Sequence, residues 1–349
     1  MQYSDRSRFR DGFCALLAVV LFAAASASAQ FTYSAISDAA GTSTYCEGVS
    51  NGSIVGYYVN SSSNANGFLY SGGGFTAVND PYAVRQVGTS PSGISGTTIV
   101  GTYLDSRTET MRGFIDNSGT FTPLDDPSAA GTTDITGISG NNIVGCYEDS
   151  SDKWHGFEYN DSTKNFTTLD ESVPTASNSG TYAGGINGNT IVGWYVSQTS
   201  NSAGSSTHGF SFNNSTYTNF DFPESTISGT TTDPQETVAT GISGNLIVGT
   251  TDVDLITNTG TGFNTVGDQY GFVYDGSNFT LLDDPAAENQ YGFGTDAQAI
   301  DGDTVVGYYY VNYDTVQGFE TIIPEPASMM LLLGGAVFLM RRPRNGARN

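Results

Sequence analysis

The sequence predicts an all-β fold, a six-bladed β-propeller with four-stranded blades, and three observations support this prediction. Gly, Ser, Thr and Asn abound beside many Tyr and Phe, and no stretch has sustained helical periodicity. A motif of eleven residues recurs six times, at intervals of 44 to 58 residues. The last repeat lacks its final strand, whereas an isolated copy of that strand stands near the N-terminus.

Each repeat unit reads as four short strands separated by Gly, Asn and Asp turns. The first two strands form the recurrent motif, which reads GISGTTIVGTY at residues 93–103. The third strand contains a Gly-Phe pair, as at residues 113–114. The fourth begins with an aromatic residue and Thr and ends near Asp, as in FTPLD at residues 121–125. Four strands in about 45–50 residues fit one propeller blade.

The two ends of the repeat region predict how the ring closes. The sixth unit has no fourth strand after Phe319, but YSAISD at residues 33–38 matches that strand. A ring in which the N-terminal strand completes the last blade accounts for both facts, whereas an open solenoid does not need this permutation. We therefore expect six blades, closed by the N-terminal strand, within a domain spanning residues 30–323.

The first 29 residues have the features of a secretory signal peptide. Three arginines precede an apolar run over residues 13–25, and a small-x-small cleavage site follows at residues 27–29. This pattern is typical of a segment that is removed during export through the Sec pathway. Residues 1–29 are therefore left out of the predicted fold.

The C-terminal segment, residues 324–349, combines a short apolar run with a basic tail. The run covers residues 327–340, and four arginines follow it. As a helix it would span about 21 Å, short of the ~30 Å hydrocarbon core of a bilayer. The basic tail would hold the C-terminus on the cytoplasmic side. We expect a short hydrophobic transmembrane helix that gives a weak or transient membrane stop.

The order of these C-terminal features resembles the PEP-CTERM sorting signal of Gram-negative bacteria. The matching residues are Pro324, Glu325, Pro326, Arg341 and Arg342. The resemblance implies a partner, an exosortase-type membrane protease that recognises and processes the tail. It also implies a location in the Gram-negative cell envelope or surface, or release outside the cell after processing.

The charge of the domain excludes some partners. Residues 30–323 contain five lysines and arginines against 32 acidic residues, a net charge of about −27. Such a surface repels phosphate backbones, so we expect no nucleic-acid partner. Anionic membrane surfaces are disfavoured for the same reason.

The stretch from Cys146 to Tyr159 gathers several reactive side chains, including His155. Both Cys146 and His155 occupy variable positions of the structural repeat, and no base stands beside a nucleophile in the pattern. We interpret the stretch as scaffold. Whether Cys46 and Cys146 pair stays open at this stage.

Three further groups each allow two interpretations. The acid at the end of the fourth strand could form a Ca²⁺-binding ring or simply make turns; it recurs as Asp125, Asp170, Asp221 and Asp283, with Asn79 and Ser37 in the other blades. Asp252 and Asp254 lie in the longest insertion, which could carry binding. Aromatic residues at the ends of the second strands could stack on sugars or pack between blades; these are Tyr103, Tyr147, Trp194, Tyr195 and Tyr308.

Across residues 31–320 the units also resemble the HAF family of bacterial extracellular repeats, whose unit contains IVGxY, HGFxY and FTxLD segments. His precedes Gly-Phe only at His155 and His208. The resemblance implies an extracellular location and this fold rather than a defined activity.

The sequence therefore predicts an exported, non-enzymatic surface protein that contacts extracellular polysaccharide of a biofilm matrix or other surface proteins. We assign no catalytic, cofactor-binding or metal-binding residues. The alternative is a Ca²⁺-dependent hydrolase or lyase with its site at the mouth of the propeller channel, and a spacer without a ligand is a third hypothesis.

Overall fold

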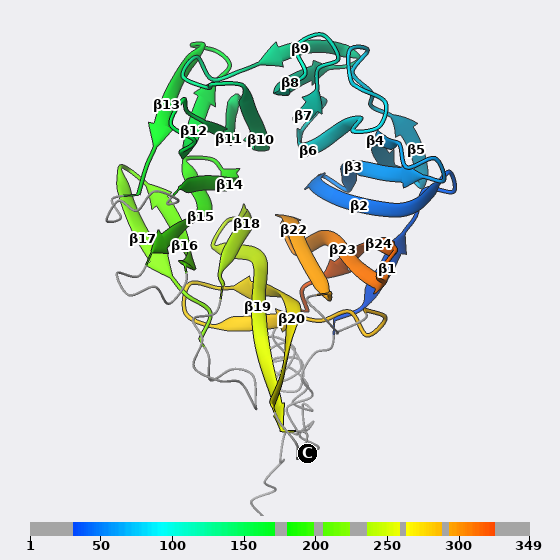
Figure 1. Cartoon of the computed structure of the whole chain (residues 1–349), viewed down its shortest axis with the longest axis vertical. Coiled ribbons are helices and arrows are strands. Elements are labelled where there is room, and N and C mark those ends of the chain that lie inside the picture. The colour runs from blue at the N-terminus through cyan, green and yellow to red at the C-terminus, as the bar shows by residue number, and fades with distance from the viewer. Residues whose placement is uncertain are drawn as a thin grey trace, which may run out of the picture. The chain divides into compact units, whose positions relative to one another are not determined.

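The computed structural model describes residues 31–171, 180–198, 205–223, 236–258, 263–287 and 293–324. These residues belong to one compact unit, Phe31–Pro324. Their secondary structure consists of strands and turns, and the strands form six antiparallel sheets of four strands each. The sheets stand around a common centre as the blades of a propeller (Figure 1). The predicted six-bladed β-propeller is confirmed.

In each of the first three blades the strands follow one another in chain order. Blade 1 consists of β2 (Gly41–Ser50), β3 (Ser53–Asn60), β4 (Ala65–Ser71) and β5 (Gly74–Ala77). Blade 2 consists of β6 (Thr89–Ser95), β7 (Thr98–Leu104), β8 (Met111–Asn117) and β9 (Thr120–Leu124). Blade 3 consists of β10 (Thr132–Ser139), β11 (Asn142–Glu148), β12 (Trp154–Asn160) and β13 (Asn165–Leu169).

Blades 4 and 5 repeat this order, and blade 6 takes its fourth strand from the other end of the chain. Blade 4 consists of β14 (Thr181–Asn187), β15 (Thr190–Gln198), β16 (Ser205–Asn213) and β17 (Thr216–Phe220). Blade 5 consists of β18 (Val238–Ser243), β19 (Leu246–Asn258), β20 (Phe263–Tyr274) and β21 (Phe279–Leu282). Blade 6 consists of β22 (Thr295–Asp301), β23 (Thr304–Asn312), β24 (Thr315–Ile322) and β1 (Tyr33–Ile36).

The pairing of β1 with β24 closes the ring. The two strands are antiparallel, with Tyr33 opposite Thr321 and Ile36 opposite Gly318. The first strands of neighbouring blades contact one another all the way round, including β2 with β22. The predicted closure of the last blade by the N-terminal strand is therefore confirmed, and Figure 1 shows β1 beside β24.

The constant residues of the repeat form the core between the blades. The Val of each IVG segment is fully buried; the six are Val55, Val100, Val144, Val192, Val248 and Val306. The Phe of each Gly-Phe pair is at most 1% exposed; the six are Phe68, Phe114, Phe157, Phe210, Phe272 and Phe319. Alternation along the strands places both residues on buried faces, where each side chain of this size stabilises the fold by about 1.5–3 kcal/mol.

A β-bulge interrupts the pairing of the first and second strands in every blade, and it explains the Gly of the IVG segment. In blade 4 the register shifts between Ala183 and Gly185. A Cβ atom on Gly193 would overlap the carbonyl oxygen of Tyr182 on the bulged strand. The equivalent glycines of the other five blades meet the same obstacle. Only Gly fits where the bulged backbone approaches so closely.

Buried threonines join each blade to the next. Their hydroxyl groups accept a hydrogen bond from the backbone N–H at the exit of the preceding blade, for example from Asp80 to Thr89 at 2.8 Å and from Phe222 to Thr237 at 2.9 Å. All six junctions have this bond; the threonines are Thr44, Thr89, Thr133, Thr181, Thr237 and Thr295. A buried N–H without a partner would be costly, so these threonines fix the spacing of the blades.

A second set of hydrogen bonds links the hairpin turns around one end of the ring. The Gly140 N–H donates to Ser95 Oγ at 3.1 Å, and the Gly302 N–H donates to Ser243 Oγ at 2.9 Å. The Asn51 N–H donates to Asp301 Oδ2 at 2.6 Å across the closure from blade 6 to blade 1. The end of the ring with these turns is therefore held tightly.

The predicted signal peptide and the residues after Pro324 lie outside the described part of the chain. The same holds for four of the five sorting-motif residues, because only Pro324 is described. In the part of the chain that the structure describes, no helix is long and apolar enough to cross a membrane.

Candidate functional site

The six bulges place one residue of each blade at the centre of the propeller. A bulge re-aims the side chain of its extra residue, here into the central channel. We call these residues the bulge ring; they are Glu47, Ser92, Thr136, Gly184, Thr240 and Gln298. The ring therefore combines one acid, three hydroxyl groups, one amide and one glycine at equivalent positions.

The three hydroxyl groups of the bulge ring bind the neighbouring blade. Ser92 Oγ donates to the carbonyl oxygen of Ile135 at 2.5 Å. Thr136 Oγ1 and Thr240 Oγ1 donate at 2.7 Å to the equivalent carbonyl oxygens of the following blades. Glu47 makes no hydrogen bond or ion pair with the described residues, so its carboxyl group faces the channel without a protein partner.

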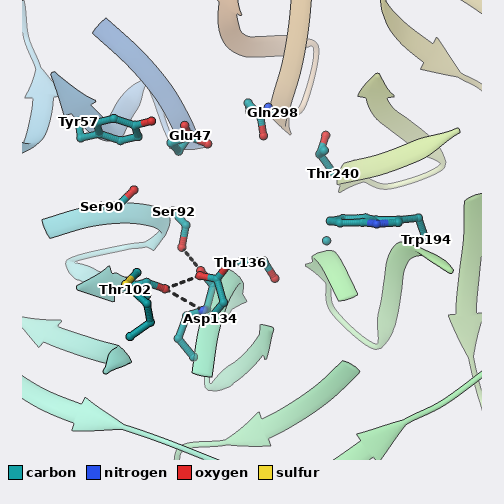
Figure 2. A pocket seen from close by; sticks show the side chains of 13 residues that line it. Glu47, Tyr57, Ser90, Ser92, Thr102, Asp134, Thr136, Trp194, Thr240 and Gln298 are labelled. Atoms are coloured by element: carbon teal, nitrogen blue, oxygen red, sulfur yellow. Dashed lines mark hydrogen bonds between the residues drawn. The ribbon is translucent and has the colours of Figure 1, made fainter. Parts of the chain in front are cut away.

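A cavity of about 320 Å³ occupies the channel on one side of the bulge ring. Figure 2 shows the residues that line it, which come from all six first strands and from β3, β7, β8 and β15. On the other side of the ring, between the backbones of all six first strands, the space falls to about 60 Å³. The larger cavity thus ends in a constriction, as a pocket does.

Two stacked aromatic pairs face each other across this cavity. In blade 1 the rings of Tyr45 and Tyr57 lie 4.5 Å apart and 12° from parallel. In blade 4 the rings of Tyr182 and Trp194 lie 5.2 Å apart and 6° from parallel. Blades 1 and 4 are opposite members of a six-blade ring, and Figure 2 shows Tyr57 and Trp194 on opposite sides of the cavity. One ring of each pair, Tyr57 or Trp194, lines the cavity and extends toward its centre, Tyr57 with its hydroxyl group foremost (Figure 2).

Two carboxylates that accept hydrogen bonds from threonines also lie in opposite blades. Thr102 Oγ1 donates to Asp134 Oδ1 at 2.5 Å, from blade 2 to blade 3. Thr250 Oγ1 donates to Asp296 Oδ1 at 2.7 Å, from blade 5 to blade 6. Blades 3 and 6 are opposite each other, so the two acids lie on opposite sides of the ring. Asp134 lines the cavity, whereas Asp296 is buried and is not among the lining residues.

The pKa values of Glu47, Asp134 and Asp296 are all raised. Burial, together with the nearby charges of Asp296 and Asp134, raises the pKa of Glu47 to about 8. Burial also raises the pKa of Asp296 to about 6, although its hydrogen bonds to Thr250 and Tyr308 act the other way. Burial raises the pKa of Asp134 too, against the effect of Thr102. No Lys, Arg or His is among the described residues that line the cavity.

This arrangement suits a ligand with flat apolar faces and hydrogen-bonding edges. Aromatic rings stack on the apolar faces, while carboxyl, hydroxyl and amide groups bind polar groups at the edges. The acids disfavour an anionic ligand. A cavity of this size, with a few placed polar groups, is typical of a small-molecule site.

The stretch from Cys146 to Tyr159 lies in β11 and β12, and its contacts are local. The His155 ring stacks on Tyr147 at 5.1 Å and contacts Asp170 at 2.8 Å and Asp149 at 3.1 Å. Burial raises the pKa of the Cys146 thiol well above its ordinary value, which makes the thiol unreactive. These contacts agree with the interpretation as scaffold. Cys46 and Cys146 are both free thiols, so they do not pair.

The acids at the ends of the fourth strands do not converge on a metal site. Three of them pair within their own blade: Asp125 with Arg112, Asp170 with His155, and Asp221 with His208. Ser37 contacts Gln317 in the same way. The next residue makes the turn, since Asp126 accepts a hydrogen bond from the N–H two residues on. Nowhere in the described residues do three His, Cys, Asp or Glu gather as metal ligands.

Of the aromatic residues at the ends of the second strands, some pack between blades and others lie at the channel. Tyr103, Tyr147 and Tyr195 are buried between blades. Trp194 lines the cavity, and Tyr308 contacts Tyr45 at 5.0 Å. Asp252 and Asp254 lie in β19, which pairs with β20 along its length, so the insertion lengthens this hairpin.

Sequence reasoning missed the bulge ring and its surroundings. The signal was present: the residue before the motif varies among the copies, with five residue types in six, and so does the residue after the Gly of IVG, with four types in six. These two variable positions line the channel, whereas the constant positions form the core.

No protein-family model and no curated protein matches the chain. Several solved propellers share the fold. A mutant of the Aleuria aurantia lectin in complex with alpha-methyl-L-fucoside is 11% identical, with 81% of this chain and 91% of that chain covered and a TM-score of 0.43. A mutant of AofleA from Arthrobotrys oligospora is 11% identical over 85% and 87%, with a TM-score of 0.47. The propeller domain of the Trilobed protease from Pyrococcus furiosus is 8% identical over 80% and 81%, with a TM-score of 0.44.

Proposed function

We propose that the protein is a non-enzymatic glycan-binding propeller whose site is the channel cavity. The observation that carries this proposal is the position of two stacked aromatic pairs, Tyr45 with Tyr57 and Tyr182 with Trp194, on opposite sides of a cavity of about 320 Å³ that Tyr57 and Trp194 line. Sugars present flat faces of C–H groups and a rim of hydroxyl groups. The aromatic rings fit those faces, and the acids and hydroxyl groups between the rings fit the rim.

The charge of the cavity narrows the class of glycan. Glu47 and Asp134 line the cavity, and no Lys, Arg or His is among the described residues that line it. A uronic acid or a sulfated sugar would add negative charge in a partly desolvated space, which is unfavourable. The cavity therefore suits neutral or ammonium-bearing sugars.

The sequence features of the two ends supply the proposed setting. A signal peptide and a PEP-CTERM tail would take the protein through the Sec pathway to an exosortase-type protease and then to the cell surface or the medium. Its ligand there would be extracellular polysaccharide of the biofilm matrix.

Calorimetric titration of the purified full-length protein with exopolysaccharide fragments of defined size tests this function. Trp194→Ala removes one aromatic ring from the cavity lining and should weaken binding about tenfold or more, as expected for a buried aromatic contact. Tyr82→Ala is the control, because Tyr82 is exposed and lies outside the cavity. Equal binding by wild type and Trp194→Ala, or no binding of neutral and amino glycans at all, would contradict the proposal.

A hydrolase or lyase at the same cavity is the second candidate, and one observation favours it. A pKa of about 8 keeps Glu47 protonated at neutral pH, as a general acid must be. Chromatography of the polymer after incubation distinguishes the two functions. Shortened chains that vanish with Glu47→Gln would replace the binding function by the enzymatic one, and a chelator in a parallel incubation would show whether Ca²⁺ takes part.

A further inference from the structure

A row of aromatic rings leads from the channel cavity to the outer rim of blade 6. Starting inside the cavity, Tyr57 stacks on Tyr45, which contacts Tyr308 of blade 6 at 5.0 Å. Tyr308 lies 6.1 Å from Tyr310, the ring of Phe293 lies 4.9 Å from Tyr310, and Tyr313 lies 5.5 Å from Phe293. We call these six residues the aromatic row; they are Tyr57, Tyr45, Tyr308, Tyr310, Phe293 and Tyr313.

The aromatic row differs from the aromatic residues of the core in exposure. Every Phe of the Gly-Phe pairs is at most 1% exposed, whereas all six members of the row are partly or fully accessible. Tyr313, at the outer end, is 79% exposed. Large apolar rings gain most from burial, and an accessible series of them marks an interaction surface.

The inner end of the aromatic row meets the acid and the amide of the bulge ring. Glu47 in blade 1 and Gln298 in blade 6 stand at the same seam between blades as Tyr45 and Tyr308. Gln298 Nε2 lies 3.5 Å from the hydroxyl group of Tyr308. Unlike the ring's Ser and Thr side chains, Glu47 has no partner among the described residues. An acid and an amide are therefore placed together where the row ends.

The channel does not continue past this point for a ligand of sugar size. Beyond the bulge ring the space is about 60 Å³, about twice the volume that one molecule occupies in liquid water. Residues of all six first strands line it, including the bulge ring and the Val or Ile two positions after each of its members. Whatever enters the cavity from the row stops at Glu47 and Gln298.

We propose that the protein holds one end of an unbranched glycan chain in the cavity, with the following sugars lying along the aromatic row of blade 6. This inference rests on the proposed glycan-binding function and adds its mode: capture of a chain end rather than of a mid-chain segment. Glu47 and Gln298 bind the hydroxyl or ammonium groups of the terminal sugar. The edge-to-face contacts of the outer rings leave ring surface for the sugars behind it.

Ladders of chito-oligosaccharides, N-acetylated and de-N-acetylated, and of β-glucan oligosaccharides test this mode by calorimetry, from the disaccharide to the octasaccharide. Affinity should rise with length until the row is covered and then level off. Tyr313→Ala should leave the disaccharide affinity unchanged and weaken binding of the hexasaccharide about three- to tenfold, the effect of one aromatic contact. Tyr82→Ala, which removes an exposed tyrosine elsewhere, should change neither.

The outcomes separate the two proposals. If no ladder binds, the glycan-binding function itself is overturned. If the disaccharide binds as tightly as the hexasaccharide, or if Tyr313→Ala has no effect on the hexasaccharide, the function stands and the aromatic row is not part of the site. Tyr57→Ala, inside the cavity, should weaken binding of both the disaccharide and the hexasaccharide. This result distinguishes a loss of contacts in the cavity from a loss of contacts along the aromatic row.

End capture also predicts how the number of binding sites depends on the number of chain ends. For a fixed mass of a polymer whose oligosaccharides bind, the number of binding sites should rise in proportion to the chain ends created by partial hydrolysis. A capacity that stays constant as ends are created would show mid-chain binding and overturn end capture.

Discussion

Replacing Glu47 by Gln should stabilise the protein, and the gain should depend on pH. Glu47 sits in the channel between Asp134 and Asp296, with a pKa raised from its ordinary value of 4.5 to about 8 by burial and by those two charges. In the unfolded chain it ionises near its ordinary value. Glu47→Gln keeps the shape of the side chain and removes the proton equilibrium.

The direction and size of the effect follow from the two pKa values. Between about pH 4.5 and pH 8 the folded state holds a proton that the unfolded state has lost, so the free energy of unfolding falls as pH rises. The contribution is complete below pH 4.5 and lost above pH 8. At about 1.36 kcal/mol for each pH unit, the interval corresponds to up to about 5 kcal/mol. The advantage of Glu47→Gln over wild type should grow across this range.

Urea unfolding followed by tryptophan fluorescence, at intervals from about pH 4.5 to about pH 9, measures this difference. Asp303→Asn is the matched control: it removes one exposed carboxylate, so its difference from wild type should stay nearly constant. If the Glu47→Gln difference is equally flat, Glu47 is not a desolvated carboxyl group, and the electrostatic account of the cavity is wrong.

Three structural predictions accompany this one. Thr237→Val leaves the buried N–H of Phe222 without its acceptor and should cost about 1–3 kcal/mol, read as a fall of about 2–6 °C in Tm. Gly193→Ala forces a Cβ against a carbonyl oxygen at the bulge and should abolish folding or cost more than 3 kcal/mol, whereas Gly74→Ala, in open space, should be nearly neutral by calorimetry. Deleting residues 31–36 removes β1 and should make hydrogen exchange rise first in β24; unchanged protection there would contradict closure by β1.

The fold was predictable because the residues that stay constant among the repeats are those that pack in the core. Val and Phe recur where alternation buries them, and the displaced fourth strand gave the closure. The junction threonines were also within reach of the sequence, since a Thr stands four residues before the motif's first residue in all six copies, from Thr44 to Thr295. The role of these threonines could not be predicted from the sequence, because their hydrogen bond to the preceding blade forms only when the blades are adjacent.

The site was harder to predict for a physical reason. A bulge depends on backbone geometry, so the sequence alone does not show that the side chain of Glu47 faces a channel. The scaffold interpretation of the stretch around His155 agrees with its contacts to Asp149 and Asp170 of the same blade. For Trp194 the sequence left stacking on sugars and packing between blades open, and the structure places it, like Tyr57 at the equivalent position, in the lining of the cavity.

Variation among the repeats follows the geometry of the ring and points to the channel. Positions that pack between blades meet the same surroundings six times, so one residue serves all of them. Positions that face the centre share one cavity, so six identical side chains would place like groups close together. Around this ring an aromatic pair, a threonine and an acid follow one another in blades 1 to 3 and again in blades 4 to 6. Glu47 occupies the bulge-ring position, where Gln, Ser, Thr or Gly stand in the other blades, and its raised pKa is expected to lower stability at neutral pH. A residue that costs stability at a position with harmless alternatives is best explained by what it binds.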